Sequence, residues 1–290
     1  MITHKRNWYL ALVLSLMVFA TSRHIHAAEP DSFPGQFLPA EKMEETGEIE
    51  TDRDSFTPAT TLVAPSKIMI EAAWTFIDNR DAKETHSLPE LLIRYGATDW
   101  LELRVGANYE IGGEAADVSN SKGAFAEGGK HEDGGLEEDA NVNYGLKFAI
   151  TDQRGWLPDS ALIIQGSTPI LGHSTATSFG GYYVFGWELR NGWLWDTSIR
   201  YGTRGGDEGS SEQWAPSTVI KIPLSEKTKA HLEYFGNFDN TPDSKTEKHY
   251  ISPGVHYLIT KNLEVGIRVG WGLNDQAAKF FSNIGFGWQF

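Results

Sequence analysis

The sequence predicts an all-β protein: a transmembrane antiparallel up-and-down β-barrel of about 12 strands, with short periplasmic turns and longer extracellular loops. Three observations predict it. From Lys67 onward apolar and polar residues alternate in segments of about ten residues, short and long connections alternate between the segments, and aromatic residues gather at segment ends. The alternation runs to the carboxyl terminus, where Ile284, Phe286, Trp288 and Phe290 occupy every second position.

The first element of the chain is a predicted signal peptide over residues 1–27. Lys5 and Arg6 precede an apolar run at 8–20, and small residues follow at and after Ala27. The run is short for a membrane-spanning helix, and no later stretch approaches the roughly 18 apolar residues that such a helix needs. We therefore expect an exported chain that crosses a membrane, if at all, as strands.

The second element is a polar, proline-rich segment over residues 28–66. Pro34, Pro39, Pro58 and Pro65 make it unsuitable as a lipid-facing strand. Two placements remain open: a periplasmic tail, or a segment that tucks into the barrel lumen near Arg53. The predicted organisation is therefore a signal peptide (1–27), an N-terminal segment (28–66) and an outer-membrane barrel (67–290).

The barrel itself contains about twelve predicted strands, an even number that places both chain ends on one side of the membrane. Each strand is a run in which apolar residues occupy one face and polar residues the other. The predicted strands are residues 67–77, 88–96, 101–110, 140–150, 160–167, 178–189, 193–203, 213–222, 229–238, 249–259, 263–273 and 279–290.

Connections of two kinds alternate between these strands. Compact ones are expected at 97–99, 151–159, 190–192, 223–228 and 260–262. The longest connection, from Glu110 to Asp139, is strongly acidic and should lie outside the cell. Its carboxylates suggest a calcium site, but their spacing differs from an EF-hand loop. Solvated loop charge is favoured, with divalent cations bridging to lipopolysaccharide phosphates as the alternative.

Alternation alone does not separate a membrane barrel from a soluble sandwich, whose polar face would meet solvent. The aromatic residues favour the membrane, because they sort into two belts as expected at lipid–water interfaces. One belt lies near the compact turns (Tyr95, Trp100, Trp187, Trp193, Trp195, Tyr257, Trp288 and Phe290). The other lies near the long loops (Trp74, Phe76, Tyr109, Tyr201, Trp214, Phe238 and Trp271).

The composition of the chain argues against several classes of function. The formal net charge is −14, and loss of Lys5, Arg6 and Arg23 with the signal peptide makes the mature chain more acidic, so nucleic acid is not expected as a partner. The chain has no cysteine, which excludes disulfides and thiolate metal sites. Enzyme motifs are missing, and His173 and Ser174 are adjacent residues without an orienting carboxylate. We expect no enzyme, cofactor or metal.

The chemistry of the chain should lie on the inward face of the strands. If the turn at 97–99 centres near Thr98, Arg94 falls directly opposite Glu102 on the inward face, and this opposite-charge pair would contribute roughly 0.2–1 kcal/mol. Two roles for the inward charges stay open: a plug network that fills the barrel, or an eyelet that selects small solutes. The inward candidates for lining the lumen are Glu71, Glu90, Arg94, Glu102, Arg104, Arg200, His231, Glu233 and Arg268, with Lys147, Asp196 and Glu264 on the same faces.

Two passages resemble one family. TDRDSFTPATTLVAPSKIMIEAAWTF (51–76) and LLIRYGATDWLELRVGANYE (91–110) are similar to the opening of the outer-membrane proteins named after the MetA pathway of phenol degradation. Asp54 and Ser55 replace that family's commoner Pro-Asp. The resemblance implies an exported barrel that transports hydrophobic aromatic compounds, and it carries no established ligand or catalytic residues. The terminal Phe290 also resembles the signature that the barrel assembly machinery reads in bacterial outer-membrane proteins.

These inferences predict a protein of the bacterial outer membrane that acts as a passive channel for small organic molecules, hydrophobic aromatic ones included. The alternative is a structural or loop-displaying barrel with a plugged lumen; an outer-membrane lipid enzyme is the third candidate. The expected partners are outer-membrane lipids and lipopolysaccharide, the barrel assembly machinery through Phe290, and a small-molecule solute.

Overall fold

The fold of the chain was analysed in a computed structural model. It describes residues 49–112, 118–119, 137–172, 176–190, 192–206, 209–240 and 245–290. All of them belong to one compact unit, Phe37–Phe290. The predicted signal peptide, most of the acidic loop and the His173–Ser174 pair lie outside the described residues. Among the described residues, no helix has the length and apolarity that a membrane-crossing helix needs.

The described part of the chain forms twelve strands, as the sequence predicted. They are β1 (Ile68–Asp78), β2 (Thr85–Gly96), β3 (Leu101–Gly112), β4 (Glu137–Thr151), β5 (Asp159–Leu171), β6 (Ser178–Glu188), β7 (Leu194–Gly206), β8 (Gly209–Ser225), β9 (Thr228–Asn240), β10 (Lys245–Thr260), β11 (Leu263–Gly272) and β12 (Phe280–Gln289).

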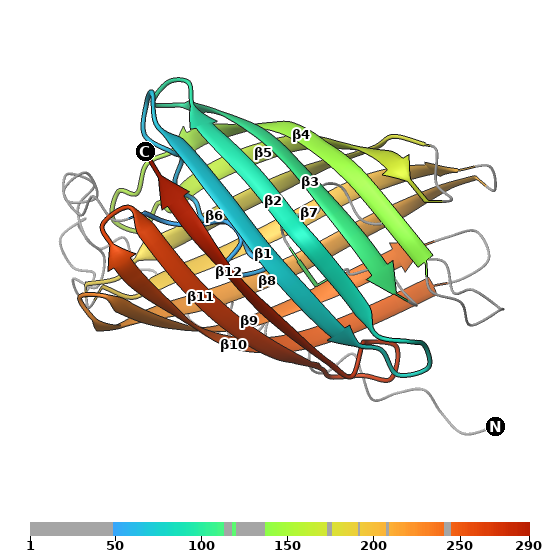
Figure 1. Cartoon of the computed structure of the whole chain (residues 1–290). Helices are drawn as coiled ribbons and strands as arrows, with labels where there is room; N and C mark the ends of the chain where they lie inside the picture. The colour runs from blue at the N-terminus through green and yellow to red at the C-terminus, as the bar shows by residue number, and fades with distance from the viewer. Residues whose placement is uncertain are drawn as a thin grey trace, which may run out of the picture. The chain divides into compact units, whose positions relative to one another are not determined.

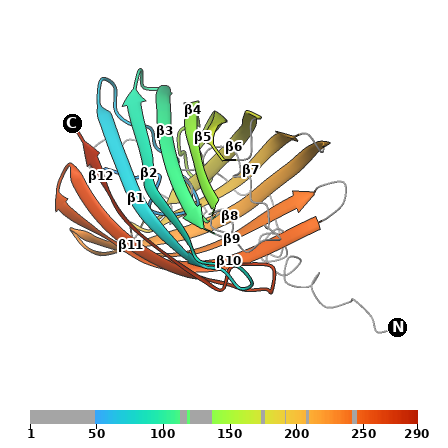
Figure 2. The ribbon, with the colours of Figure 1, turned by 45° about the vertical axis from the view of Figure 1, so that its right-hand side comes forward.

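Each strand pairs antiparallel with its neighbours in sequence, and β12 pairs with β1 to close the barrel (Figures 1 and 2). Closure leaves no unpaired strand edge, which a backbone in lipid requires. The last residue takes part: Ile68 N donates to Phe290 O at 3.0 Å, and Phe290 N donates to Ile68 O at 3.0 Å. The end of the barrel that contains Phe290 and the turns after β2, β4, β6, β8 and β10 is called the short-turn end below.

Several strands are longer than predicted. β8 begins at Gly209 rather than at residue 213 and ends at Ser225 rather than at 222, so the connection expected at 223–228 shrinks to a two-residue turn at 226–227. The physical reason is that a strand emerging from the membrane has water on its outer face. Its side chains can then be polar on both faces while the backbone ladder continues, so the alternation that predicts strands disappears before the strand ends.

The distribution of polarity is the reverse of that in a soluble protein. On β11 the inward residues Glu264, Gly266 and Arg268 are buried, while Ile267 and Trp271 are 51% and 45% exposed. The same contrast extends over the wall, where buried positions are rich in charged residues and exposed positions in large apolar ones. The apolar sides of the strands therefore face lipid, and the polar sides face an enclosed interior.

Aromatic rings meet one another across the outer face at both ends of the barrel. Near the short-turn end, Trp187 lies against Trp195 with ring centroids 5.2 Å apart. Toward the other end, Trp214 stacks on Phe238 at 4.7 Å. Such rings have an apolar body and, in tryptophan, a polar N–H, which suits the boundary between lipid and water.

A charge on the middle of the outer face should destabilise the barrel. Ile267 lies between Val255 on β10 and Ile284 on β12, all three exposed. We expect Ile267→Arg to lower the free energy of unfolding in phospholipid vesicles by about 2–4 kcal/mol, because the guanidinium must enter hydrocarbon. Denaturant titration measures this, with Lys261→Arg in the β10–β11 turn as the matched control. Equal stability of the two variants would contradict a lipid-facing position for Ile267.

Candidate functional site: the plugged lumen

The lumen holds a segment of the chain itself. Residues 49–66, called the plug segment below, precede β1, and most of their side chains are buried, with Thr51, Asp52, Ser55 and Thr57 fully so. This segment contains no strand apart from one isolated bridge. Its buried polar groups must therefore find partners on the barrel wall.

The tip of the plug segment is held by one carboxylate of the wall. Glu233, on β9, accepts hydrogen bonds from Phe56 N at 2.8 Å, from Thr57 N at 2.7 Å and from Thr57 Oγ1 at 2.7 Å. Thr57 Oγ1 also lies 2.8 Å from the hydroxyl of Ser217 on β8. The wall carboxylate thus satisfies two main-chain N–H groups at the turn of the segment, as a capping side chain does for a helix end.

The parts of the plug segment before and after the tip are also held by wall carboxylates, closer to the short-turn end. Glu71, on β1, accepts from the main-chain N of Asp52 at 3.0 Å and of Arg53 at 2.9 Å. In the part after the tip, Glu102 accepts from Val63 N at 2.9 Å. Inward carboxylates of three strands therefore bind main-chain N–H groups of the plug segment.

An ion network surrounds Asp52 of the plug segment. Its carboxylate lies 2.6 Å from Arg104 Nη1, 3.4 Å from Lys147 Nζ and 3.7 Å from Arg94 Nη1. Burial raises the pKa of this carboxyl, but Arg94, Lys147 and Arg104 outweigh burial and hold the pKa below its usual range. Asp52 therefore stays ionised at neutral pH. It also accepts a hydrogen bond from Ala59 N at 3.0 Å, which links the part of the plug segment before the tip to the part after it.

Between the tip and the end of the barrel opposite the short-turn end, the lumen is filled by apolar side chains. Phe56 stacks on Phe235 with centroids 4.2 Å apart, and the Arg200 guanidinium lies 3.7 Å from the centre of the Phe56 ring. The remaining members of this buried cluster are Ile77, Val118, Ala215, Tyr250, Ala277, Ala278 and Phe281. The plug segment and this apolar layer together occupy the middle of the barrel.

The structure places all twelve inward candidates at positions no more than 4% exposed. It brings Glu71, Arg94, Glu102, Arg104 and Lys147 together around Asp52. The other seven lie in smaller groups or separately. Glu233 and Arg268 form an ion pair at 3.4 Å, Arg200 packs on the Phe56 ring, and His231 contacts His256. Glu264 accepts a hydrogen bond from Thr51, and Glu90 accepts hydrogen bonds from Ser119 and Asn283. Asp196 lies buried on β7.

The predicted contact between Arg94 and Glu102 is confirmed, since Arg94 Nε lies 2.9 Å from Glu102 Oε1. The register behind that prediction was wrong. Arg94 pairs with Arg104 across the ladder, and Glu102 pairs with Gly96. The contact is therefore diagonal. The long Arg94 side chain reaches it, and Glu102 lies between two guanidiniums whose mutual repulsion it offsets.

Sequence reasoning missed some wall partners of the plug segment, among them Lys221 and His256. Lys221 on β8 lies 3.0 Å from Asp54, and His256 on β10 lies close to the same carboxylate. Both residues occupy inward positions of their strands, so the alternation could have indicated them. Asp54 is one of the two positions where the chain departs from the commoner family pattern.

Comparison with known proteins agrees with this architecture. A family model described as "Putative MetA-pathway of phenol degradation" matches residues 51–290. The COG4313 outer membrane channel from Pseudomonas putida F1 is 12% identical, with a TM-score of 0.56 over 84% of this chain and 100% of that one. The NanC porin is 10% identical, with a TM-score of 0.50 over 76% of this chain and 98% of that one. No curated protein matches the sequence. The chain is an outer-membrane β-barrel of a bacterium.

Proposed function

Since the chain belongs to the family described as the putative MetA-pathway of phenol degradation, and its lumen is closed by a segment of its own, we propose that it is a gated outer-membrane channel. In this proposal small organic molecules, hydrophobic aromatic ones included, diffuse through the barrel when the plug segment shifts. The fold it shares with outer-membrane channels and porins supports the same proposal.

One observation carries the proposal: every contact that holds the plug segment is non-covalent. Glu233, Glu71 and Glu102 of the wall bind it through hydrogen bonds. Its own Asp52 and Asp54 form ion pairs with Arg104 and Lys221 of the wall. The chain has no cysteine, so no disulfide fixes the segment to the wall. Displacement of the segment would leave a passage lined by polar side chains, with aromatic rings at Phe235, Tyr250 and Phe281.

The second candidate function is a structural barrel whose lumen stays plugged. The dense packing around Phe56 favours it, because stacking on Phe235 and contact with Arg200 give the closed arrangement an apolar and electrostatic basis. A lipid enzyme gains no support from the described residues, and the two solved structures compared above are a channel and a porin. We also propose that outer-membrane lipids and lipopolysaccharide surround the barrel and that the assembly machinery reads the strand ending in Phe290.

Flux through the purified, full-length protein tests the function. In planar bilayers we expect intermittent single-channel currents, each open interval reporting a displaced plug segment. In vesicles we expect benzoate to leave faster than cyclohexanecarboxylate, a non-aromatic solute of matched charge and similar size, because the apolar layer offers aromatic surfaces. A folded barrel that carries neither current nor solute would exclude the channel and leave the structural alternative.

A further inference from the structure

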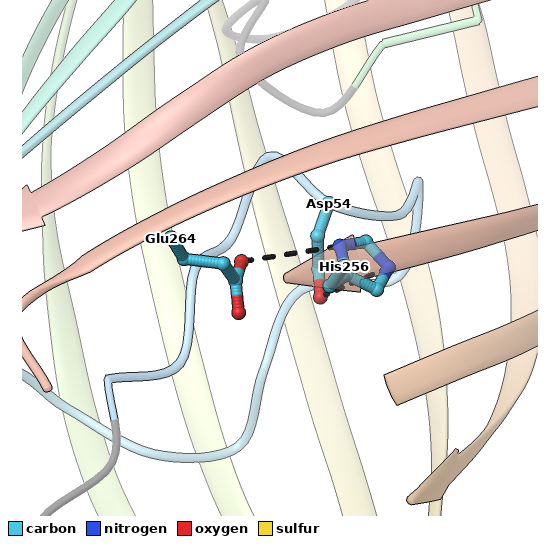
Figure 3. A group of neighbouring side chains, drawn as sticks. All are labelled: Asp54, His256 and Glu264. Carbon is cyan, nitrogen blue, oxygen red and sulfur yellow. Dashed lines mark ion pairs between the residues drawn. The ribbon is translucent and has the colours of Figure 1, made fainter. Parts of the chain in front are cut away.

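Three ionisable side chains from separate parts of the chain meet beside the plug segment. Asp54 comes from the plug segment, His256 from β10 and Glu264 from β11, and Figure 3 shows both carboxylates alongside the imidazole. One ligand atom from each residue lies within 4.8 Å of the others, and each residue is no more than 4% exposed. Glu264 is the second residue of β11, so the group lies near the short-turn end.

The imidazole of His256 is held in an orientation that leaves one nitrogen available. Its Nε2 lies 2.6 Å from Nδ1 of His231, and the two rings stack with centroids 4.8 Å apart. Its Nδ1 is buried and has no hydrogen-bond partner among the residues that the structure describes. If Nε2 donates its proton to His231, a neutral His256 presents the lone pair of Nδ1 toward Glu264. A histidine that donates through one nitrogen and binds through the other is the usual arrangement at metal sites.

The distances suit a shared ion better than direct hydrogen bonds. His256 Nδ1, the nitrogen left available, lies 3.9 Å from Glu264 Oε1. The carboxylate of Asp54 lies 3.9 Å from the other nitrogen, Nε2, so it must turn toward Nδ1 to share an ion. Both separations are too long for a hydrogen bond. Two ligands that each bind zinc at about 2.0–2.2 Å are separated by at most about 4.3 Å. Closing the group around an ion therefore needs a movement of the Asp54 carboxylate toward Nδ1, which Asp54 can make because it lies outside the strands.

Space beside the free nitrogen is provided by a glycine. Gly266 lies two residues after Glu264 on the inward face of β11, and a Cβ at this position would lie 2.7 Å from His256 Nδ1. Any larger residue would therefore press on the ring. The position is open only because it has no side chain.

The charges around the group are compatible with a divalent cation. Asp54 and Glu264 supply two negative charges. Lys221 pairs with Asp54 at 3.0 Å but also with Glu50 at 3.2 Å, so it keeps a partner when Asp54 turns to an ion. The guanidinium of Arg53 lies nearby and repels a cation. The two negative charges of Asp54 and Glu264 offset this repulsion. One imidazole with two carboxylates is a donor set that zinc accepts and that calcium and magnesium, which prefer oxygen ligands only, do not.

We propose that Asp54, His256 and Glu264 form a site for a zinc-class divalent cation, and that the bound ion holds the plug segment against β10 and β11. His231 orients His256 through the ring-to-ring hydrogen bond. Because Asp54 belongs to the plug segment and the other two ligands to the wall, the ion cross-links the two parts, and zinc stabilises the closed lumen. The site stands independently of whether the barrel conducts.

Metal binding to the full-length protein in detergent tests the site. After removal of metal with a chelator, we expect one Zn²⁺ per chain by competition with a chromophoric chelator, and a Co²⁺ absorption spectrum with tetrahedral intensity. His256→Gln and Glu264→Gln should each weaken binding by on the order of 100-fold. Gly266→Ala should weaken it as well while leaving every donor in place. His249→Gln, on the same strand but bonded to Tyr234, is the matched control and should bind as the wild type does.

A second readout separates a lost ligand from a damaged fold. Over long digestions, Zn²⁺ should further slow the residual trypsin cleavage after Arg53 in the wild type and in His249→Gln, and should have no effect on it in His256→Gln. Only preparations that show the heat-dependent gel mobility of a folded barrel are compared. Absence of stoichiometric binding to the wild type would overturn the proposal, and so would wild-type affinity in folded His256→Gln. Neither result depends on conductance, so failure of this site is distinct from failure of the channel.

Discussion

Glu233→Ala is expected to release the tip of the plug segment and to raise the open probability of the barrel by roughly 1,000-fold or more. The substitution removes the acceptor of three hydrogen bonds from Phe56 and Thr57. Hydrogen bonds to a charged group contribute about 1.5–3 kcal/mol each. It also deprives the buried Arg268 of its carboxylate at 3.4 Å. Breaking such a buried pair costs about 3–5 kcal/mol, and the closed state, in which Arg268 is kept from water, bears more of that cost than the open state.

Single-channel recording measures the effect, with Asp196→Ala as the control. Asp196 is a buried carboxylate of the wall, and among the described residues its side chain forms no hydrogen bond or ion pair with the plug segment. Glu233→Gln, which keeps one acceptor oxygen, should give an intermediate open probability. An open probability in Glu233→Ala equal to that in Asp196→Ala would show that Glu233 does not hold the segment.

Asp52→Asn should loosen the base of the plug segment. Arg104, Lys147 and Arg94 lie within 3.7 Å of the Asp52 carboxylate, and all three are buried. A neutral amide removes the one anion that contacts all three cations, although Glu71 and Glu102 still pair with the two arginines. Weakening this buried network destabilises the inserted segment by about 3–5 kcal/mol. We expect trypsin to cleave after Arg53, a peptide bond protected in the wild type because Arg53 is only 2% exposed.

The control for this cleavage is a carboxylate of the same type on the surface. Asp152 pairs with Arg154 at 3.9 Å, with both side chains about three-quarters exposed. Such pairs contribute about 0–1 kcal/mol, so Asp152→Asn should leave Arg53 protected. Protection of Arg53 in both variants would mean that the ion network around Asp52 is not required to keep the segment in the lumen.

The barrel was predictable from the sequence because lipid imposes a simple rule on every strand. Residues such as Ile267 and Arg268 must face opposite sides, and this alternation is visible without any partner strand. The strand ends were less predictable, since β8 begins at Gly209, in a stretch where polar residues follow one another and no alternation is visible. The contact of Arg94 with Glu102 followed from shared inward orientation, while its diagonal register depended on turn geometry that spacing alone does not determine.

The plug segment could not be placed from sequence. A polar, proline-containing segment has the same composition whether it lies in the periplasm or in a polar lumen, so both placements remained open. Its contacts join residues far apart in the chain: Phe56 and Glu233 are 177 positions apart. The meeting of Asp54 with His256 and Glu264 depends on the same insertion. No local pattern carries this information, because each partner alone is an ordinary inward side chain of its strand.

The central claim is that the plug segment closes the lumen and that its displacement opens it. A reversible cross-link tests this directly, because the chain has no cysteine of its own. Thr57 Oγ1 and Ser217 Oγ lie 2.8 Å apart, so Thr57→Cys with Ser217→Cys should form a disulfide between the plug segment and β8. Ser198→Cys with Ser217→Cys, which joins two wall residues whose hydroxyls are also 2.8 Å apart, is the matched control.

The measurement is single-channel current through each double variant before and after reduction. We predict that the oxidised Thr57–Ser217 pair is silent and that a reductant restores its openings, while the oxidised Ser198–Ser217 pair opens as the wild type does. Openings that persist at wild-type frequency while the plug segment is cross-linked to β8 would contradict the account.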